Sequence, residues 1–229
     1  MTPHPGVTRE KMEIHEEIGD PPMSDAPPWL RTTGTHRAPS PPARSGETPF
    51  RVLFVCTGNI CRSAFAEILL RARLGPHSTV DVSSAGTMAV VGHDLEQEMA
   101  ARADLMDLPH AGHRARQLTG RILAGSDLVL VFEEHHYSWV LDERPDTLPR
   151  LLALGQAAAA LRSVVDGRRV PWESLADTVH ALRPEPQPVD WVTDPYRRGA
   201  QAAAHTATRI TEDIGTILAR VAPAPSRRS

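Results

Sequence analysis

The spacing of hydrophobic positions changes from segment to segment along this chain, and the changes predict alternating strands and helices. Residues 51–56 (RVLFVC) form a short, continuous apolar run of the kind found in buried strands. Residues 62–74 then place apolar side chains near helical spacing. These apolar positions are Phe65, Ile68, Leu69 and Leu74. The stretch therefore predicts a strand, a short loop and a helix in direct succession.

The same alternation continues downstream. Strands are expected at residues 79–84, 126–132 and 148–154, and helices at residues 95–108 and 200–221. The expected apolar anchors of these two helices are Met99, Leu105 and Met106 in the first and Ile210, Ile214, Ile217, Leu218 and Val221 in the second. Residues 155–192 predict one or two short helices and then a Pro-rich loop. Strands that alternate with helices are typical of an α/β fold with a parallel sheet.

The first 49 of the 229 residues differ in composition from the rest. They hold ten of the 21 prolines and few large aliphatic residues. Such a segment buries too little apolar surface to offset its ordering entropy, so residues 1–49 are predicted to be a disordered extension. A Pro-rich docking arm at PSPPARSGETP and a transient helix at Lys11–Ile18 remain alternatives. The folded domain is expected at residues 50–222, with a disordered tail at 223–229.

Charge and cysteine content narrow the class of protein. The net charge of −3 gives no electrostatic signal for binding nucleic acid. No apolar run is long enough for a membrane span, and the N-terminus lacks the pattern of a signal peptide. The two cysteines, Cys56 and Cys61, are too few for a disulfide-stapled secreted domain. These features favour a cytoplasmic protein without a nucleic-acid or membrane partner.

The loop CTGNICRS, residues 56–63, carries the main chemical signal. It lies between the carboxyl end of a predicted strand and the start of a helix, where free backbone N–H groups and the helix dipole favour an anion. Gly58 is expected to allow a backbone path that other residues resist. Arg62 adds a planar fork of donors that matches two phosphate oxygens. The loop is therefore predicted to bind a phosphate group.

The cysteine at the start of this loop is the expected nucleophile. Amide donors, a guanidinium group and a helix N-terminus around a thiol favour the thiolate form without a histidine base. Ser63 is placed to donate its hydroxyl hydrogen to the Cys56 sulfur. A thiolate that faces a bound phosphate can attack it in line and form a phosphocysteine.

Such chemistry needs a proton donor for the leaving oxygen, and Asp194 in WVTDPYRRG is the candidate. An Asp-Pro pair by itself usually marks only a turn. The chain lacks the nucleotide-binding pattern G-x-x-x-x-G-K-[ST]. No metal or other cofactor is predicted, because His135 and His136 are adjacent rather than four residues apart. The acidic residues Glu133, Glu134, Asp142 and Glu143 are interpreted as a solvated helix face.

Five stretches together resemble the low-molecular-weight protein tyrosine phosphatases. They are VLFVCTGNICRSAFAE, SSAGT, HAGHRARQLT, SDLVLVFEEHH and TDPYRRG, in the order that the family has them, and the resemblance covers about residues 50–221. It implies a four-stranded parallel sheet flanked by helices and hydrolysis of phosphotyrosine. By motif position it implies these roles: Cys56 as nucleophile, Arg62 as phosphate clamp and Asp194 as acid and then base; Thr57, Gly58, Asn59, Ile60, Cys61, Ser63 and Tyr196 as binding residues; and Ser84 and His113 as supporting residues.

The chain also departs from the family pattern, and the departures keep alternatives open. Residues 88–91 (MAVV) stand where tyrosine-specific members tend to have an aromatic wall, which leaves Tyr196 as the expected aromatic contact. Phosphoarginine phosphatases, which resemble this loop, tend to have threonine where this chain has Ile60. Cys61 is either a buried loop residue or the partner of Cys56 in a protective disulfide. The alternative functions are hydrolysis of another phosphoester or of phosphoarginine, and phosphate binding without catalysis.

The implied partners follow from the leading function. They are a phosphotyrosine-containing protein as substrate and a tyrosine kinase as a further candidate partner.

Overall fold

The structure is a computed structural model that describes residues 48–223, and its centre is a parallel sheet of four strands. The strands are β1 (Phe50–Cys56), β2 (Val80–Gly86), β3 (Leu128–Val131) and β4 (Leu151–Ala153), in the order β2-β1-β3-β4. All three pairings are parallel. This arrangement confirms the predicted α/β class and the four-stranded sheet.

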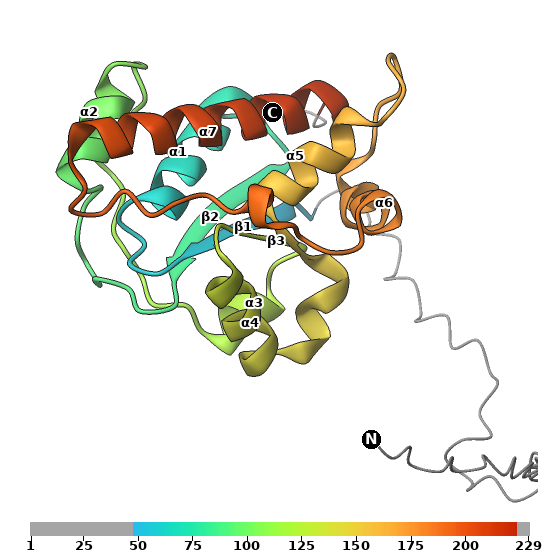
Figure 1. Ribbon diagram of the computed structural model, residues 1–229, viewed down its shortest axis with the longest axis horizontal. Coiled ribbons are helices and arrows are strands. Elements are labelled where there is room, and N and C mark those ends of the chain that lie inside the picture. The colour runs from blue at the N-terminus through green and yellow to red at the C-terminus, as the bar shows by residue number, and fades with distance from the viewer. Residues whose placement is uncertain (1–47, 224–229) are drawn as a thin grey trace, which may run out of the picture. The chain divides into compact units, whose positions relative to one another are not determined.

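Helices cover both faces of the sheet (Figure 1). On one face lie α1 (Arg62–Leu74), α2 (Gln97–Asp104), α5 (Leu154–Arg162) and α7 (Gly199–Arg220). On the other lie α3 (Gly120–Ala124) and α4 (Glu134–Glu143). The remaining elements are α6 (Leu175–Leu182) and the short 3₁₀ helices η3 (Pro145–Arg150), η4 (Trp172–Ser174) and η5 (Pro188–Asp190). The predicted helix at residues 62–74 has the observed bounds of α1.

Strand β1 connects the two halves of the core. Its alternate side chains Val52, Phe54 and Cys56 pack on the α1 and α7 side, whereas Leu53 and Val55 pack on the α3 and α4 side. All five side chains are buried. A central parallel strand covered on both faces reads as a continuous apolar run, which is why residues 51–56 predicted it.

Two predicted elements are shorter than the pattern suggested. The helix expected at residues 95–108 stops at Asp104, and Leu105 is 74% exposed, so its expected role as an anchor is wrong. Asp107 adopts a left-handed backbone with φ of 53°, which a continuing helix excludes. The strand expected at 148–154 is only three residues long because Pro145 and Pro149 hold the preceding segment in η3.

In the segment predicted to hold one or two short helices and a Pro-rich loop, the structure has α5 and α6, and the short helix η5 lies in the stretch expected to be the loop. The predicted disorder, docking arm and short helix of residues 1–49 fall almost wholly on residues outside the described range, as does the tail after residue 223. Over residues 48–223, none of the helices has the combination of length and apolar character that crossing a membrane requires.

Candidate active site

The candidate site lies at the carboxyl ends of β1 and β3, which are neighbours in the sheet although β2 separates them in sequence. In an open parallel sheet, a reversal of strand order of this kind opens a crevice for ligands. Cys56 is the last residue of β1, and Glu133 follows the end of β3 by two residues. The two strands therefore bring residues from distant parts of the chain to one place.

The loop after β1 turns its carbonyl groups outward. These carbonyls accept hydrogen bonds from Thr87 N to Cys56 O (2.9 Å), Met88 N to Thr57 O (3.0 Å), Val90 N to Gly58 O (3.0 Å), His113 Nε2 to Asn59 O (2.8 Å) and Glu96 N to Ile60 O (2.8 Å). The N–H groups of residues 57–61 take no part in the hydrogen bonds of the described residues. A curled loop with its carbonyls held outside leaves its amides free for an anion, as the predicted nest requires.

The residue with the unusual backbone in this loop is Asn59 rather than Gly58. Asn59 has φ of 55°, whereas Gly58 is not among the residues of positive φ, so the conformational role expected of Gly58 was wrong. Asparagine is one of the few residues with a side chain that tolerates this region. Its Oδ1 accepts from Arg116 N at 2.9 Å, which holds the strained position in place.

The hydrogen bonds of Asn59 also orient Ser63 toward the nucleophile. Asn59 Nδ2 donates to Ser63 Oγ at 2.9 Å and to Ser84 Oγ at 2.7 Å. Because the Ser63 oxygen accepts there, its own hydrogen is free for the Cys56 sulfur, which lies 3.0 Å away. Ser84 in turn donates to Glu67 Oε2 at 2.5 Å. Asn59 therefore begins two branches of donors, one that runs through Ser63 to the Cys56 sulfur and one that runs through Ser84 to Glu67.

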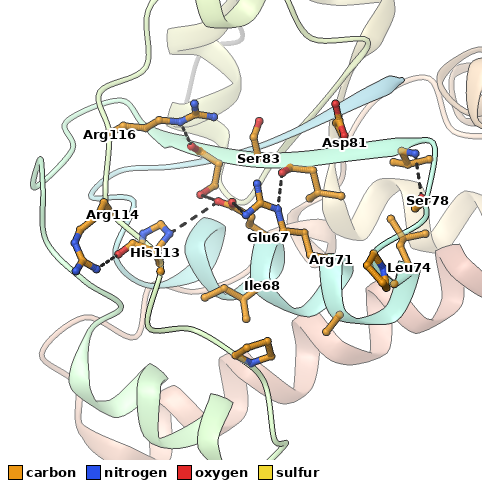
Figure 2. A pocket seen from close by; sticks show the side chains of 18 residues that line it. Glu67, Ile68, Arg71, Leu74, Ser78, Asp81, Ser83, His113, Arg114 and Arg116 are labelled. Carbon is orange, nitrogen blue, oxygen red and sulfur yellow. Dashed lines mark hydrogen bonds and ion pairs between the residues drawn. The ribbon is translucent and has the colours of Figure 1, made fainter. Parts of the chain in front are cut away.

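Glu67 and His113 lie next to each other at the Ser84 end of this network (Figure 2). Glu67 pairs with Arg71 at 2.9 Å, and His113 Nδ1 lies 3.9 Å from its carboxylate. His113 contacts the backbone of Asn59 rather than the sulfur. These positions agree with the supporting role expected of Ser84 and His113, whereas Glu67 was missed by sequence reasoning.

Gly86 explains the fit of the SSAGT motif against the loop. A Cβ atom at Gly86 would lie 2.4 Å from Thr57 O and 3.0 Å from Asn59 N. Any side chain would therefore push the loop away from the end of β2.

Arg62 links the loop to the segment that follows β3 and to the segment that precedes α7. It is 1% exposed and donates from Nη1 to Val192 O at 3.0 Å and to the Glu133 carboxylate. Its Nη2 lies 3.2 Å from Asp194 Oδ2, so the predicted clamp and the predicted acid meet across 132 residues. Its Nε is buried and has no hydrogen-bond partner among the described residues. An unpaired buried donor is costly, and an oxyanion in the nest would satisfy it.

The interpretation of Glu133 as part of a solvated helix face was wrong. The carboxylate pairs with Arg62, and the next two histidines contact Thr57. His136 Nδ1 accepts from Glu133 N at 3.1 Å, so its Nε2 carries the hydrogen that is donated to Thr57 Oγ1 at 2.9 Å. Sequence reasoning missed these residues, although they directly follow a predicted strand end.

Glu133 and the two histidines that follow it form the one group within residues 48–223 that could hold a metal ion. Ligand atoms of Glu133, His135 and His136 lie within 4.8 Å of one another. Adjacency of the two histidines was therefore a poor reason to exclude a metal. Both nitrogens of His136 and the Glu133 carboxylate already have partners, which an ion would have to displace.

Burial, with Arg62 and His135 nearby, lowers the pKa of His136 from 6.5 to about 2. Between these values the unfolded chain binds a proton at this position and the folded chain does not, so acid favours unfolding. We expect His136 to lower the free energy of unfolding by about 2 kcal/mol between about pH 6.5 and pH 5. Urea unfolding at several pH values should show a flatter profile for His136→Gln. The exposed His205 provides the control, since His205→Gln should keep the wild-type slope.

The second cysteine of the loop differs from the first. Burial raises the pKa of the Cys61 thiol, and the nearby Cys56, Glu96 and Asp194 raise it further, against a smaller opposing effect of Arg62. Cys61 is therefore a neutral thiol at physiological pH. Both cysteines are free, so the disulfide between them stays a prediction.

The mouth of the site has aliphatic and aromatic parts. Met88 and Val91, which are 74% and 66% exposed, follow the loop on the β2 side. Tyr196 is 41% exposed, carries the Arg197 guanidinium 5.1 Å from its ring centre, and donates its backbone N–H to Asp194 Oδ1 at 3.2 Å. Ile60 is buried beside Gly58 rather than exposed at the mouth.

The fold and the site together define a class of protein: a parallel α/β protein with a cysteine-to-arginine oxyanion loop at a strand end. A family model described as "Low molecular weight phosphotyrosine protein phosphatase" matches residues 51–158. The curated relatives include the low molecular weight protein-tyrosine-phosphatases Wzb of Salmonella typhi and Etp of Escherichia coli. They are 35% and 37% identical over 105 residues, which is 46% of this chain and 68% and 69% of theirs. The chain belongs to the low-molecular-weight protein tyrosine phosphatase family.

Solved structures support the fold. The tyrosine phosphatase AmsI of Erwinia amylovora matches with a TM-score of 0.59 at 23% identity, over 79% of this chain and 98% of its own. Wzb from Escherichia coli K30, in complex with sulphate, matches with a TM-score of 0.54 at 25% identity, over 72% and 94%. The family model ends at residue 158, so the place of Asp194 rests on its contact with Arg62.

Proposed function

We propose that this chain is a protein tyrosine phosphatase that hydrolyses phosphotyrosine through a phosphocysteine intermediate. The observation that carries the proposal is the contact of Arg62 Nη2 with Asp194 Oδ2 at 3.2 Å. This contact joins the phosphate-binding loop to a carboxyl group that is 37% exposed and can reach a substrate. A protein that only bound phosphate would have no use for an acid at that position.

In the first step the Cys56 thiolate attacks phosphorus in line with the bond to the tyrosine oxygen. The amides of residues 57–61, which have no partner among the described residues, and the Arg62 fork stabilise the charge on the three equatorial oxygens. The acid of this step is the carboxyl group of Asp194 in its protonated form. As the sulfur–phosphorus bond forms and the phosphorus–oxygen bond breaks, Asp194 gives that proton to the leaving phenolate.

In the second step the roles reverse. Asp194, now ionised, takes a proton from a water molecule that attacks the phosphocysteine on the side that the phenol has left. The sulfur–phosphorus bond breaks, inorganic phosphate forms, and the thiolate is restored. The Ser63 hydroxyl group, 3.0 Å from the sulfur, stabilises the returning negative charge.

Two observations on relatives support this function. The matched relatives are named protein-tyrosine-phosphatases, and the Escherichia coli K30 Wzb structure holds sulphate, an oxyanion like phosphate. The substrate is therefore proposed to be a phosphotyrosine-containing protein, with the tyrosine kinase that phosphorylates it as a second partner. A nucleophilic thiolate needs a reducing compartment, which favours the cytoplasm as the place of action.

A panel of three phosphopeptides with one sequence, carrying phosphotyrosine, phosphoserine or phosphoarginine, tests the substrate class. We expect the phosphotyrosine peptide to have the highest kcat/KM, by about 100-fold or more. The phenolate is a better leaving group than the serine alkoxide, and the aliphatic and aromatic residues at the mouth favour a ring over a guanidinium group. Release of inorganic phosphate measures each rate. A preference for phosphoarginine, or binding of all three peptides without phosphate release, would replace the proposal with one of the alternatives.

A further inference from the structure

A pocket opens beside the phosphate-binding loop, along one face of α4. Its volume is about 640 Å³, within the usual range of ligand pockets. Its lining includes Glu133, Glu134, His135, Trp139, Asp142 and Trp191. This set is called the α4 pocket below.

The α4 pocket is continuous with the catalytic site through two shared residues. Glu133 pairs with Arg62, and His135 Nε2 lies 3.2 Å from Thr57 Oγ1. On the opposite side, Trp191 immediately precedes Val192, whose carbonyl accepts from Arg62. When the phosphorylated side chain of a peptide enters the loop, a neighbouring residue of that peptide therefore lies beside this pocket.

The chemistry of the pocket is acidic and aromatic. Glu134 and Asp142 lie eight residues apart on α4, two turns along one face, and both are exposed. Within residues 48–223 neither forms an ion pair, and no lysine or arginine lines the pocket. Trp139 is four residues after His135, so its indole lies on the same face, and Trp191 completes the aromatic part.

Carboxylates beside indole rings select for cations. A guanidinium group stacks on the face of tryptophan and pairs with carboxylates at the same time. We propose that the α4 pocket binds a basic side chain, preferably arginine, that flanks the phosphorylated residue of the substrate. This inference rests on the proposed function, because it assigns the sequence preference of the same site.

Two phosphotyrosine heptapeptides that differ only in having arginine or glutamine next to the phosphotyrosine test the preference. We expect kcat/KM to be about tenfold higher for the arginine peptide, as a partly exposed cation–π contact and an ion pair act together. The ratio should fall as salt is added, because the carboxylates are exposed. Glu134→Gln combined with Asp142→Asn should bring the ratio to about twofold or less.

A matched control separates local contact from overall charge. Glu143→Gln combined with Glu173→Gln makes the same change in net charge but lies outside the pocket, and it should keep the wild-type ratio. The inference is overturned if the two peptides react equally in the wild type, or if the pocket double variant keeps the preference.

Two further readouts separate this inference from the proposed function. Turnover of a small aryl phosphate, which has no flanking residue, reports on the proposed function alone. Tryptophan fluorescence can monitor binding of each peptide to the Cys56→Ser variant. The two affinities then give the preference for the arginine peptide without any turnover. If the protein hydrolyses the aryl phosphate but binds both peptides equally, the proposed function stands and the proposed role of the α4 pocket is wrong.

Discussion

Replacing Cys56 with serine is expected to lower turnover of an aryl phosphate by at least about 10⁴-fold, the scale on which loss of a nucleophile acts. A serine hydroxyl group is a far weaker acid than a thiol, and no described side chain near Cys56 is placed as a base for it. The nearest hydroxyl, that of Ser63 at 3.0 Å, donates toward the sulfur rather than accepting from it. Steady-state hydrolysis of an aryl phosphate, with thermal unfolding to confirm the fold, measures the effect.

The informative comparison is with the other cysteine of the loop. Cys61 is buried and neutral, so Cys61→Ser should lower turnover of the aryl phosphate by less than about tenfold. Phosphate binding should survive in Cys56→Ser, since the outward carbonyls and Arg62 that shape the nest are unchanged. Turnover that survived Cys56→Ser would remove the phosphocysteine from the mechanism.

Local sequence was enough to locate the candidate phosphate-binding loop. A buried strand, a loop and a helix in direct succession bring Cys56, Arg62 and Ser63 together within one short stretch. The residue types that favour an anion there act over a few residues, so no knowledge of the rest of the fold was needed.

The sequence predicted less well the roles of residues that depend on the order of strands in the sheet. Glu133 looked like a solvated helix residue because the sequence does not say that β3 lies beside β1. The same reason hid His136 and its contact with Thr57. A search of the residues that follow each predicted strand would have found both, because parallel strands end at one edge of the sheet. The unusual backbone conformation was assigned to Gly58 instead of Asn59 for another reason. Asparagine tolerates a positive φ when hydrogen bonds hold its side chain, and the partners in those hydrogen bonds, Ser84 and Arg116, come from distant segments.

Asp194→Asn is expected to lower kcat for phosphotyrosine by about 10²–10⁴-fold, the usual contribution of an acid or base. Asparagine has nearly the same shape and can keep the contact with the Tyr196 N–H, but it cannot hold or give a proton at the leaving oxygen. The loss should be smaller for an aryl phosphate whose phenol is more acidic, because that leaving group departs without protonation. A series of aryl phosphates that differ in the acidity of the phenol measures this dependence.

The same variant should bind phosphate more tightly, which separates a chemical role from a structural one. Asp194 lies 3.2 Å from Arg62 Nη2, where its charge competes with an anion for the guanidinium group. Removing the charge should lower the inhibition constant of inorganic phosphate even as kcat falls, whereas a misfolded site would lose both. The exposed Asp177 on α6 is the matched control, and Asp177→Asn should leave the leaving-group dependence and phosphate inhibition as in the wild type. A fall in kcat that was equal for every leaving group would show that Asp194 positions the loop instead of protonating the product.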